Sequence, residues 1–219
     1  MDKNDLLKNV RVLYHSCVRL QGDKVIYVDP YELSQAPHDA DIILITHEHY
    51  DHFSPADIAK VKGAQTVLVA PESMRQLVLS AGFAAEQVVL VEAGQTLAIA
   101  GVELEIIPAY NVGKQFHPQA NRWVGYVIAL DGVRYYVAGD TDATEDNRQV
   151  RCDVALLPVG GTYTMDAQQA AALANQLKPQ AAVPIHYGAI VGEKEDGQRF
   201  CQLLDAAIAS AMLTERCAD

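Results

Sequence analysis

Three of the seven histidines in the chain fall within six residues, at His47, His49 and His52, and Asp51 lies among them. Residues two apart on an extended chain point the same way, so His47 and His49 can bind one cation. The turn that follows can present Asp51 and His52 to a second. Imidazole with carboxylate suits zinc, iron or manganese better than calcium or magnesium, which prefer oxygen ligands. A solvated loop rich in histidine is the alternative, and the density of the run argues against it.

The residues before this cluster predict how it is positioned. The apolar run 42–45 is rich in β-branched residues and predicts a buried strand that carries the cluster to the rim of a sheet. Other predicted strands also end in His or Asp, namely at Asp29, Asp140 and His186. Such convergence of strand ends is what a metal site at one rim of a sheet requires.

Two further residues at strand ends have two interpretations each. Asp29 either receives the N–H of a ligating histidine or caps its own loop. His15 follows the first predicted strand, and we expect it to be a satisfied structural histidine, with a place in the cleft as the alternative.

The rest of the chain alternates between strand and helix patterns. Hairpins are predicted for 10–14 with 24–28, for 96–99 with 102–107 and for 123–130 with 133–138. We expect the second of these hairpins to complete the first half of the domain. Buried strands are predicted at 66–70, 88–91, 153–158 and 181–185, and helices at 55–62, 71–81, 166–177 and 197–213. Ser54 and Pro55 begin the first helix and Gly63 is expected to end it, while Asp166 and Gln169 form a capping box.

Length and composition limit the classes of protein. At 219 residues the chain fits one α/β domain spanning 1–219. A formal net charge of −11 disfavours nucleic acid and anionic membranes as partners. The segment 1–5 is charged, unlike a signal peptide, and no apolar run is long enough for membrane insertion, so we expect a cytoplasmic protein. The four cysteines form no Cys-x-x-Cys pair, which argues against a disulfide framework.

Three motifs together carry a resemblance to a known family: Thr46-His47-Glu48-His49-Tyr50-Asp51-His52, Gly139-Asp140-Thr141 and Pro184-Ile185-His186-Tyr187-Gly188. In this order the chain resembles the metallo-β-lactamase fold superfamily of metal-dependent hydrolases. Within it, the chain is similar to the compact branch that includes ascorbate-phosphate lactonases and the N-acylphosphatidylethanolamine phospholipase D type. The resemblance implies an α/β fold, a four-layered αβ/βα sandwich, with a binuclear metal site at the edge between two sheets.

The resemblance also implies ligands. His47 and His49 match ligands of the first metal, Asp51, His52 and His186 those of the second, and Asp140 the carboxylate that bridges both. The third ligand of the first metal departs from the pattern, because the expected histidine position reads Pro108-Ala109-Tyr110-Asn111. Either His117 reaches the site from a folded-back loop or Asn111 serves as a poor oxygen ligand. We favour His117.

Such a site would hold two zinc ions, with manganese or iron as alternatives, and would use a shared hydroxide as nucleophile. Asp51 is expected both to ligate and to orient that hydroxide. Tyr110, Tyr163 and Tyr187 lie beside predicted ligands and are candidates for protonating the leaving group, with packing at the rim as the alternative.

The predicted function is a metal-dependent hydrolase of a small ester, lactone or phosphate-containing molecule. The alternative is a metal-binding protein of the same fold with little turnover and a regulatory or partner-binding role. His49 stands where flavodiiron-type members carry Glu, which favours hydrolysis. The loops 32–39, 111–122 and 189–196 would set specificity, and the sequence gives no prediction of oligomeric state.

Overall fold

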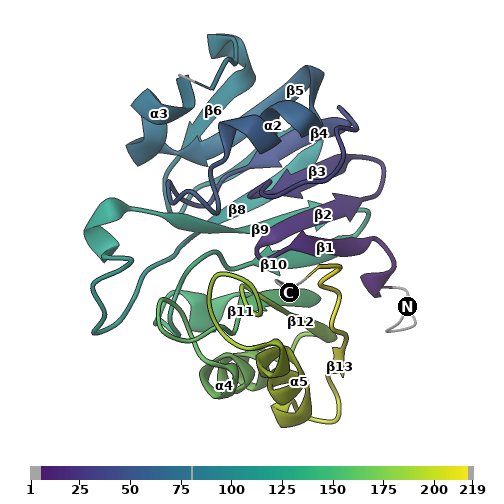
Figure 1. The fold of residues 1–219 in the computed structure, drawn as a ribbon, viewed down its shortest axis with the longest axis vertical. Helices are drawn as coiled ribbons and strands as arrows, with labels where there is room; N and C mark the ends of the chain where they lie inside the picture. Colours follow the sequence, from purple (N-terminus) through teal and green to yellow (C-terminus); the bar gives the residue numbers. More distant parts are fainter. Residues whose placement is uncertain (1–5, 80, 217–219) are drawn as a thin grey trace.

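The computed structural model describes residues 6–79 and 81–216, and its strands form two mixed sheets (Figure 1). The first sheet has the order β1 to β6, with bounds Val10–Tyr14, Cys17–Gln21, Val25–Val28, Ala40–Leu44, Lys62–Pro71 and Val88–Val91. The second has the order β13-β12-β11-β10-β9-β8-β7. From β7 to β13 the bounds are Thr96–Ile99, Val102–Pro108, Val124–Leu130, Val133–Val137, Val154–Pro158, Ala181–Ile185 and Ala209–Ser210.

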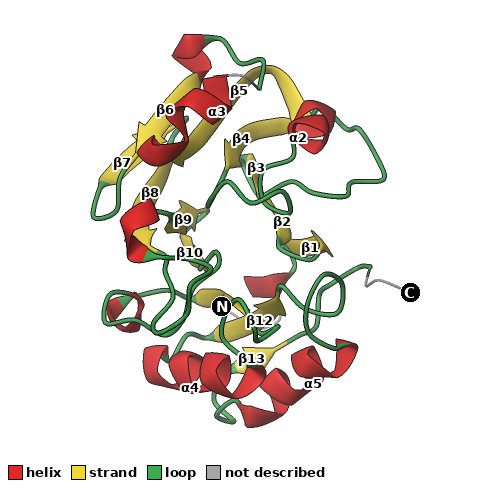
Figure 2. Cartoon of the chain, turned by 60° about the vertical axis from the view of Figure 1, so that its left-hand side comes forward, coloured by secondary structure: helices red, strands yellow, loops and turns green. Residues whose placement is uncertain are grey.

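Helices cover the outer face of each sheet (Figure 2). Helices α2 (Pro55–Val61) and α3 (Arg75–Leu79) pack on the first sheet, and α4 (Ala167–Leu177) and α5 (Lys194–Leu203) on the second. Short 3-10 turns span Glu72–Met74, Ala85–Gln87, Gln119–Asn121 and Asn147–Gln149. One apolar core fills the space between the sheets, and a further core lies under each pair of helices. The predicted four-layered αβ/βα sandwich is therefore confirmed.

Local sequence signals explain where two helices begin. The Ser54 side chain accepts the N–H of Asp57 ahead of α2, and Pro55 occupies the first helical position, where its missing N–H costs nothing. At α4, Asp166 and Gln169 form the predicted capping box. Both predicted helix starts are confirmed.

Three predicted boundaries in the first sheet are wrong. The opening hairpin is instead a three-stranded meander, because the chain already turns at His15 in a left-handed conformation and β2 lies between the two predicted strands. Gly63 does not end α2, since Lys62 is extended and begins β5 directly. The helix predicted at 71–81 is shorter, a 3-10 turn followed by α3.

Two predictions in the second sheet also need correction. The β7–β8 hairpin does not close the first half, because β8 pairs with β9 along its length and so joins the second sheet. The helix predicted at 197–213 begins at Lys194, where Glu193 and Asp196 make a capping box, and it ends at Leu203. Residues Ala209–Ser210 then pair with β12 as a strand.

Among the described residues, no helix combines the length and the apolar content needed to cross a membrane. Cys17, Cys152 and Cys201 are free thiols. Cys217 and the charged segment 1–5 lie outside the described residues.

The two sheets are joined directly where the chain leaves β4. The buried Tyr126 hydroxyl of β9 donates to the Ile45 carbonyl at 2.6 Å, and the Val124 N–H donates to the Thr46 carbonyl at 3.2 Å. Gly139, after β10, has φ of 66°, and a Cβ there would lie 3.0 Å from the Val124 carbonyl oxygen and 3.1 Å from the Cβ of Thr46. Only glycine allows this approach without displacement of the backbone.

We expect Tyr126→Phe to lower the free energy of unfolding by about 1–2 kcal/mol, because the buried Ile45 carbonyl would lose its donor. Urea denaturation measures the change. Tyr135→Phe is the matched control, since Tyr135 lies in the same core and its hydroxyl has no hydrogen bond among the described residues. Equal effects of the two substitutions would contradict this role for Tyr126.

Candidate metal centre

Six strands deliver polar side chains to one edge of the sandwich. In the first sheet β1, β3 and β4 run in the same direction, and in the second β8, β10 and β12 do so. Their carboxyl ends therefore share an edge within each sheet, and these two edges meet. The residues after these strands are, in chain order, His15, Asp29, His47 to His52, Asn111 with His117, Asp140 and His186.

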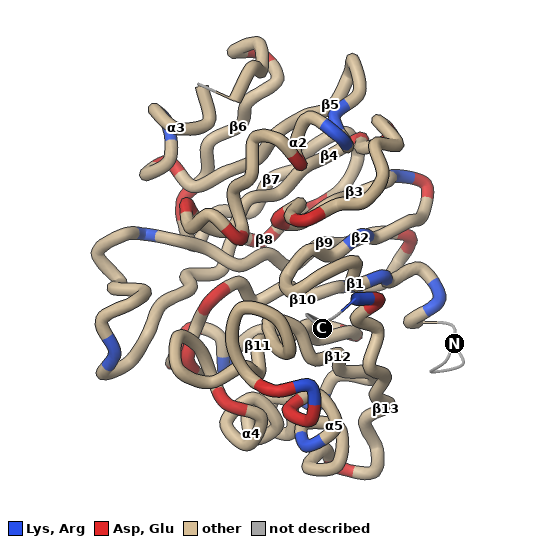
Figure 3. The backbone as a smooth tube through the Cα atoms, viewed as in Figure 1, with Lys and Arg blue, Asp and Glu red and all other residues tan. Residues whose placement is uncertain are grey.

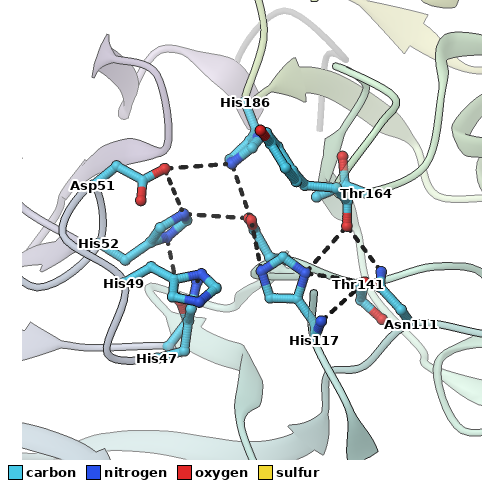
Figure 4. A network of polar contacts seen from close by, with 12 residues as sticks. His47, His49, Asp51, His52, Asn111, His117, Thr141, Thr164 and His186 are labelled. Atoms are coloured by element: carbon cyan, nitrogen blue, oxygen red, sulfur yellow. Dashed lines mark hydrogen bonds and ion pairs between the residues drawn. The ribbon is translucent and has the colours of Figure 1, made fainter. Parts of the chain in front are cut away.

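Three histidines form one group at this edge (Figure 4). Nε2 of His47 lies 3.0 Å from Nδ1 of His49, and the ring of His117 packs edge-on against both. One nitrogen from each of the three lies within 4.8 Å of the others. His47 and His117 are buried and His49 is partly exposed, so the group faces solvent on one side.

Asp140 links that group to the rest of the site. Its Oδ2 lies 3.2 Å from Nε2 of His117 and 3.0 Å from Nε2 of His186, and its Oδ1 lies 3.3 Å from Nε2 of His52. Oδ2 of Asp51 lies 3.5 Å from His52 Nε2 and 3.7 Å from His186 Nε2. The Asp140 carboxylate is thus placed between the two sets of histidines.

His15 lies in the same cluster, so the expectation of a satisfied structural histidine is wrong. Neither of its ring nitrogens has a hydrogen-bond partner in the part of the chain that the structure describes, and Nε2 is 3.4 Å from Oδ2 of Asp51. Its ring lies 4.0 Å from that of His186, and its carbonyl accepts the His186 N–H. The missed signal was the position of His15 after β1, which runs parallel to β3 and β4.

The donor set fits divalent cations. Buried nitrogen and oxygen atoms that have no hydrogen-bond partner among the described residues converge here: both ring nitrogens of His15 and His186, Nε2 of His52 and His117, and Oδ1 of Asp140. Such atoms are costly to bury unless something satisfies them. Ligands 2.0–2.1 Å from a tetrahedral ion lie about 3.3–3.4 Å apart, close to the separations of 3.0–3.7 Å found here.

Hydrogen bonds behind the cluster fix which ring nitrogen faces it. His52 Nδ1 lies 2.7 Å from Oδ2 of Asp29, which also accepts the Thr46 hydroxyl at 2.6 Å. Because that hydroxyl donates to Asp29, it accepts from Nδ1 of His47 at 3.0 Å. The Nε2 lone pairs of His47 and His52 then point into the site. Of the two interpretations of Asp29, contact with a cluster histidine is therefore the correct one.

Asn111 lies behind His117. Its Oδ1 accepts from the backbone N–H of His117 at 3.0 Å and lies 3.1 Å from His117 Nδ1. The Tyr163 carbonyl is also 3.1 Å from that nitrogen. The loop thus folds back so that His117 Nε2 faces the cluster and Asn111 orients the ring from behind.

Electrostatics favour the protonation states that ligands need at His47, His15 and Asp140. At His52 and His186 burial alone would lower the pKa, but the carboxylate of Asp140 outweighs it and raises the pKa of both rings. Burial, with the neighbouring His52, lowers the pKa of His47 well below its usual value, and burial lowers that of His15 to about 4. Burial alone would raise the pKa of Asp140, but His186 and His52 outweigh it and hold that pKa well below the ordinary range. The Asp140 carboxylate is therefore ionised and the rings of His47 and His15 are neutral, as metal binding requires.

The tyrosine candidates are placed differently from one another. The Tyr110 hydroxyl donates to Asp146 at 2.8 Å, and the buried Tyr187 ring packs against Gly197 of α5, so neither lines the pocket above the cluster. Tyr163 does. This pocket of about 280 Å³ is lined by His49, Tyr50, Asp51, Phe116, His117, Asp140, Tyr163, His186 and Ile190.

Comparisons with known proteins agree with this geometry. Residues 9–186 match the family described as a β-lactamase superfamily domain. A UPF0173 metal-dependent hydrolase of Methanosphaerula palustris is 31% identical over 87% of this chain and 88% of its own, and one of Methanoregula boonei is 34% identical over 80% of each. A solved structure from Parabacteroides distasonis, described as a proposed metal-dependent hydrolase, is 30% identical with a TM-score of 0.79, covering 94% of this chain and 93% of that one.

We expect Asp29→Asn to weaken metal binding by about 10-fold to 100-fold, because the amide offers one acceptor atom where the carboxylate serves three donors. Competition with a chelator measures the affinity. Asp205→Asn, at an exposed position, is the control. Unchanged affinity in Asp29→Asn would show that this carboxylate does not orient His52.

Proposed function

The chain belongs to the β-lactamase superfamily and to its metal-dependent hydrolases, and on that premise we propose a hydrolase of small molecules with two divalent cations at this edge. One observation carries the proposal: candidate ligand atoms that follow five strands converge on one centre, and most of these atoms are buried without hydrogen-bond partners among the described residues. The substrate would be an ester, a lactone or a phosphate-containing molecule.

The residues divide into two sets with one shared member. His47, His49 and His117 would hold the first ion. Asp51, which contacts both His52 and His186, would hold the second with them, and Asp140 would lie between the two sets. Zinc suits this mixture of imidazole and carboxylate, and manganese or iron are alternatives. Asn111 would act through His117 and not as a ligand.

His15 is a further candidate donor to the second ion. Its Nε2, Oδ2 of Asp51 and one ring nitrogen of His186 lie within 4.8 Å of one another. The backbone hydrogen bond from His186 to His15 holds the two rings together across the junction of the sheets.

When bound, cations of this kind supply Lewis acidity and lower the pKa of water towards neutrality. The residues of the chain would orient the water and bind the substrate. Asp51, at the floor of the pocket and held ionised by its histidine neighbours, would orient the attacking water. The pocket above would hold the substrate against the centre. Of the three tyrosines considered as proton donors to the leaving group, only Tyr163 lines this pocket among the described residues.

The alternative of a metal-binding protein with little turnover rests on the absence of a histidine at position 111, where the third ligand of the first metal is expected. With His117 beside His47 and His49, no feature of the described residues favours that alternative.

We expect Asp140→Ala to abolish hydrolysis and to lower metal content from about two ions per chain, because both sets of ligands lose their shared carboxylate. Elemental analysis, esterase and phosphodiesterase assays, and circular dichroism measure the three properties. Asp205→Asn again serves as control. Full activity in a folded Asp140→Ala protein would refute the assignment.

His15→Ala should weaken only the second of two metal-binding steps, since His15 contacts Asp51 and His186 but not His47 or His49. Zinc titration resolves the steps, and His49→Ala should instead weaken the step at the first site. Loss of both steps in His15→Ala, with the fold retained, would contradict separate donor sets.

A further inference from the structure

The pocket above the cluster has a polar floor and apolar walls. The floor consists of the proposed ligands, whereas the walls are Tyr50, Phe116, Tyr163 and Ile190. Tyr50 is 64% exposed, Phe116 45% and Ile190 36%, and these three are among the few large hydrophobic side chains that face solvent. Exposed apolar side chains gathered around a polar centre mark a surface that binds apolar groups.

The walls come from four loops, and three of the wall residues form ring contacts. The rings of Phe116 and Tyr163 meet edge to face with centroids 4.7 Å apart, and Tyr50 packs edge-on against Tyr31 at 6.0 Å. Ile190 lies beyond the end of β12, in the loop after His186. The Phe116–Tyr163 contact holds two of the wall side chains against each other, and Tyr31 supports a third, so these rings form a surface for a ligand.

No lysine or arginine lines the pocket among the described residues. Lys114 is close in sequence to Phe116, but its ammonium group binds Asp142 at 2.6 Å and the Thr164 carbonyl at 2.5 Å. Elsewhere the cationic residues are dispersed along the chain (Figure 3). A phosphate group usually meets Arg, Lys or clustered N–H donors, and these walls offer no such cation.

We infer that the substrate is a neutral carboxylic ester or lactone whose acyl part is apolar and small, and that Phe116 and Ile190 bind this part. The inference rests on the proposed hydrolase function and narrows its substrate class. A cavity of about 280 Å³ holds roughly ten non-hydrogen atoms, by comparison with the 30 Å³ occupied by one water molecule in the liquid. Burial of each methylene against these walls should raise affinity about fourfold.

The test uses the zinc-loaded full chain with p-nitrophenyl acetate, p-nitrophenyl butanoate and bis(p-nitrophenyl) phosphate. We expect kcat/KM for the butanoate, which has two more methylenes, to exceed that for the acetate by about 16-fold, and both to exceed that for the diester. Phe116→Ala should reduce the butanoate-to-acetate ratio at least threefold, and Phe116→Lys should raise the relative turnover of the diester. Met212→Ala, 54% exposed and outside the pocket, should leave both ratios unchanged.

Faster turnover of the diester than of the two esters would overturn the inference, and so would a butanoate-to-acetate ratio of kcat/KM that Phe116→Ala does not alter. Neither result would contradict the proposed hydrolase function. Turnover of none of the three would overturn the proposed function instead. In that case, calorimetric titration with the carboxylates from acetate to pentanoate tests the inference separately, by measuring their affinities for the zinc-loaded chain. Affinity should rise about fourfold per methylene from acetate to pentanoate, and equal affinities, or tighter binding of inorganic phosphate, would contradict it.

Discussion

Burial of unpaired imidazole and carboxylate groups around a common centre is the constraint on which this structure depends. Asp140 is 4% exposed, and the histidines around it are almost fully enclosed, yet several of their nitrogen and oxygen atoms have no hydrogen-bond partner within residues 6–79 and 81–216. Leaving such groups buried costs on the order of 1–3 kcal/mol each. Cations at the centre would satisfy these atoms, so the free energy of metal binding would also stabilise the fold.

The sandwich supports this centre by fixing the ends of its strands. Tyr126 and Gly139 bring β9 and the end of β10 against Ile45 and Thr46, so the second sheet determines where the turn after β4 begins. Thr46 then connects the fold to the site, because its backbone N–H and its hydroxyl both bind Asp29. Packing between the sheets and orientation of the ligands are thus parts of one network.

Much of this arrangement could be predicted from the sequence. The run from His47 to His52 follows an apolar strand, and Asp140 and His186 also follow predicted strands, so strand direction alone brings them together. Turns and capping residues likewise set the starts of α2 and α4 through local hydrogen bonds. The helix starts are predicted correctly because each depends on residues three positions apart, and each ligand at a strand end is predicted from the apolar run just before it.

The remainder depends on contacts between distant segments. His117 reaches the centre because Asn111 and the Tyr163 carbonyl hold its backbone and ring, and loop composition does not encode that path. The sequence predicts a structural role for His15, and this prediction is wrong because the neighbours of His15 in the fold, Asp51 and His186, are far from it in sequence. Helix α5 ends at Leu203, earlier than predicted, because Ala209–Ser210 pair with β12 as a strand.

Anomalous diffraction from crystals of the zinc-loaded protein tests the central claim most directly. The account predicts two peaks about 3.5–4 Å apart, one among His47, His49 and His117 and the other beside Asp51, His52 and His186, with Asp140 touching both. Peaks elsewhere, or a centre in which these side chains bind no ion, would contradict it.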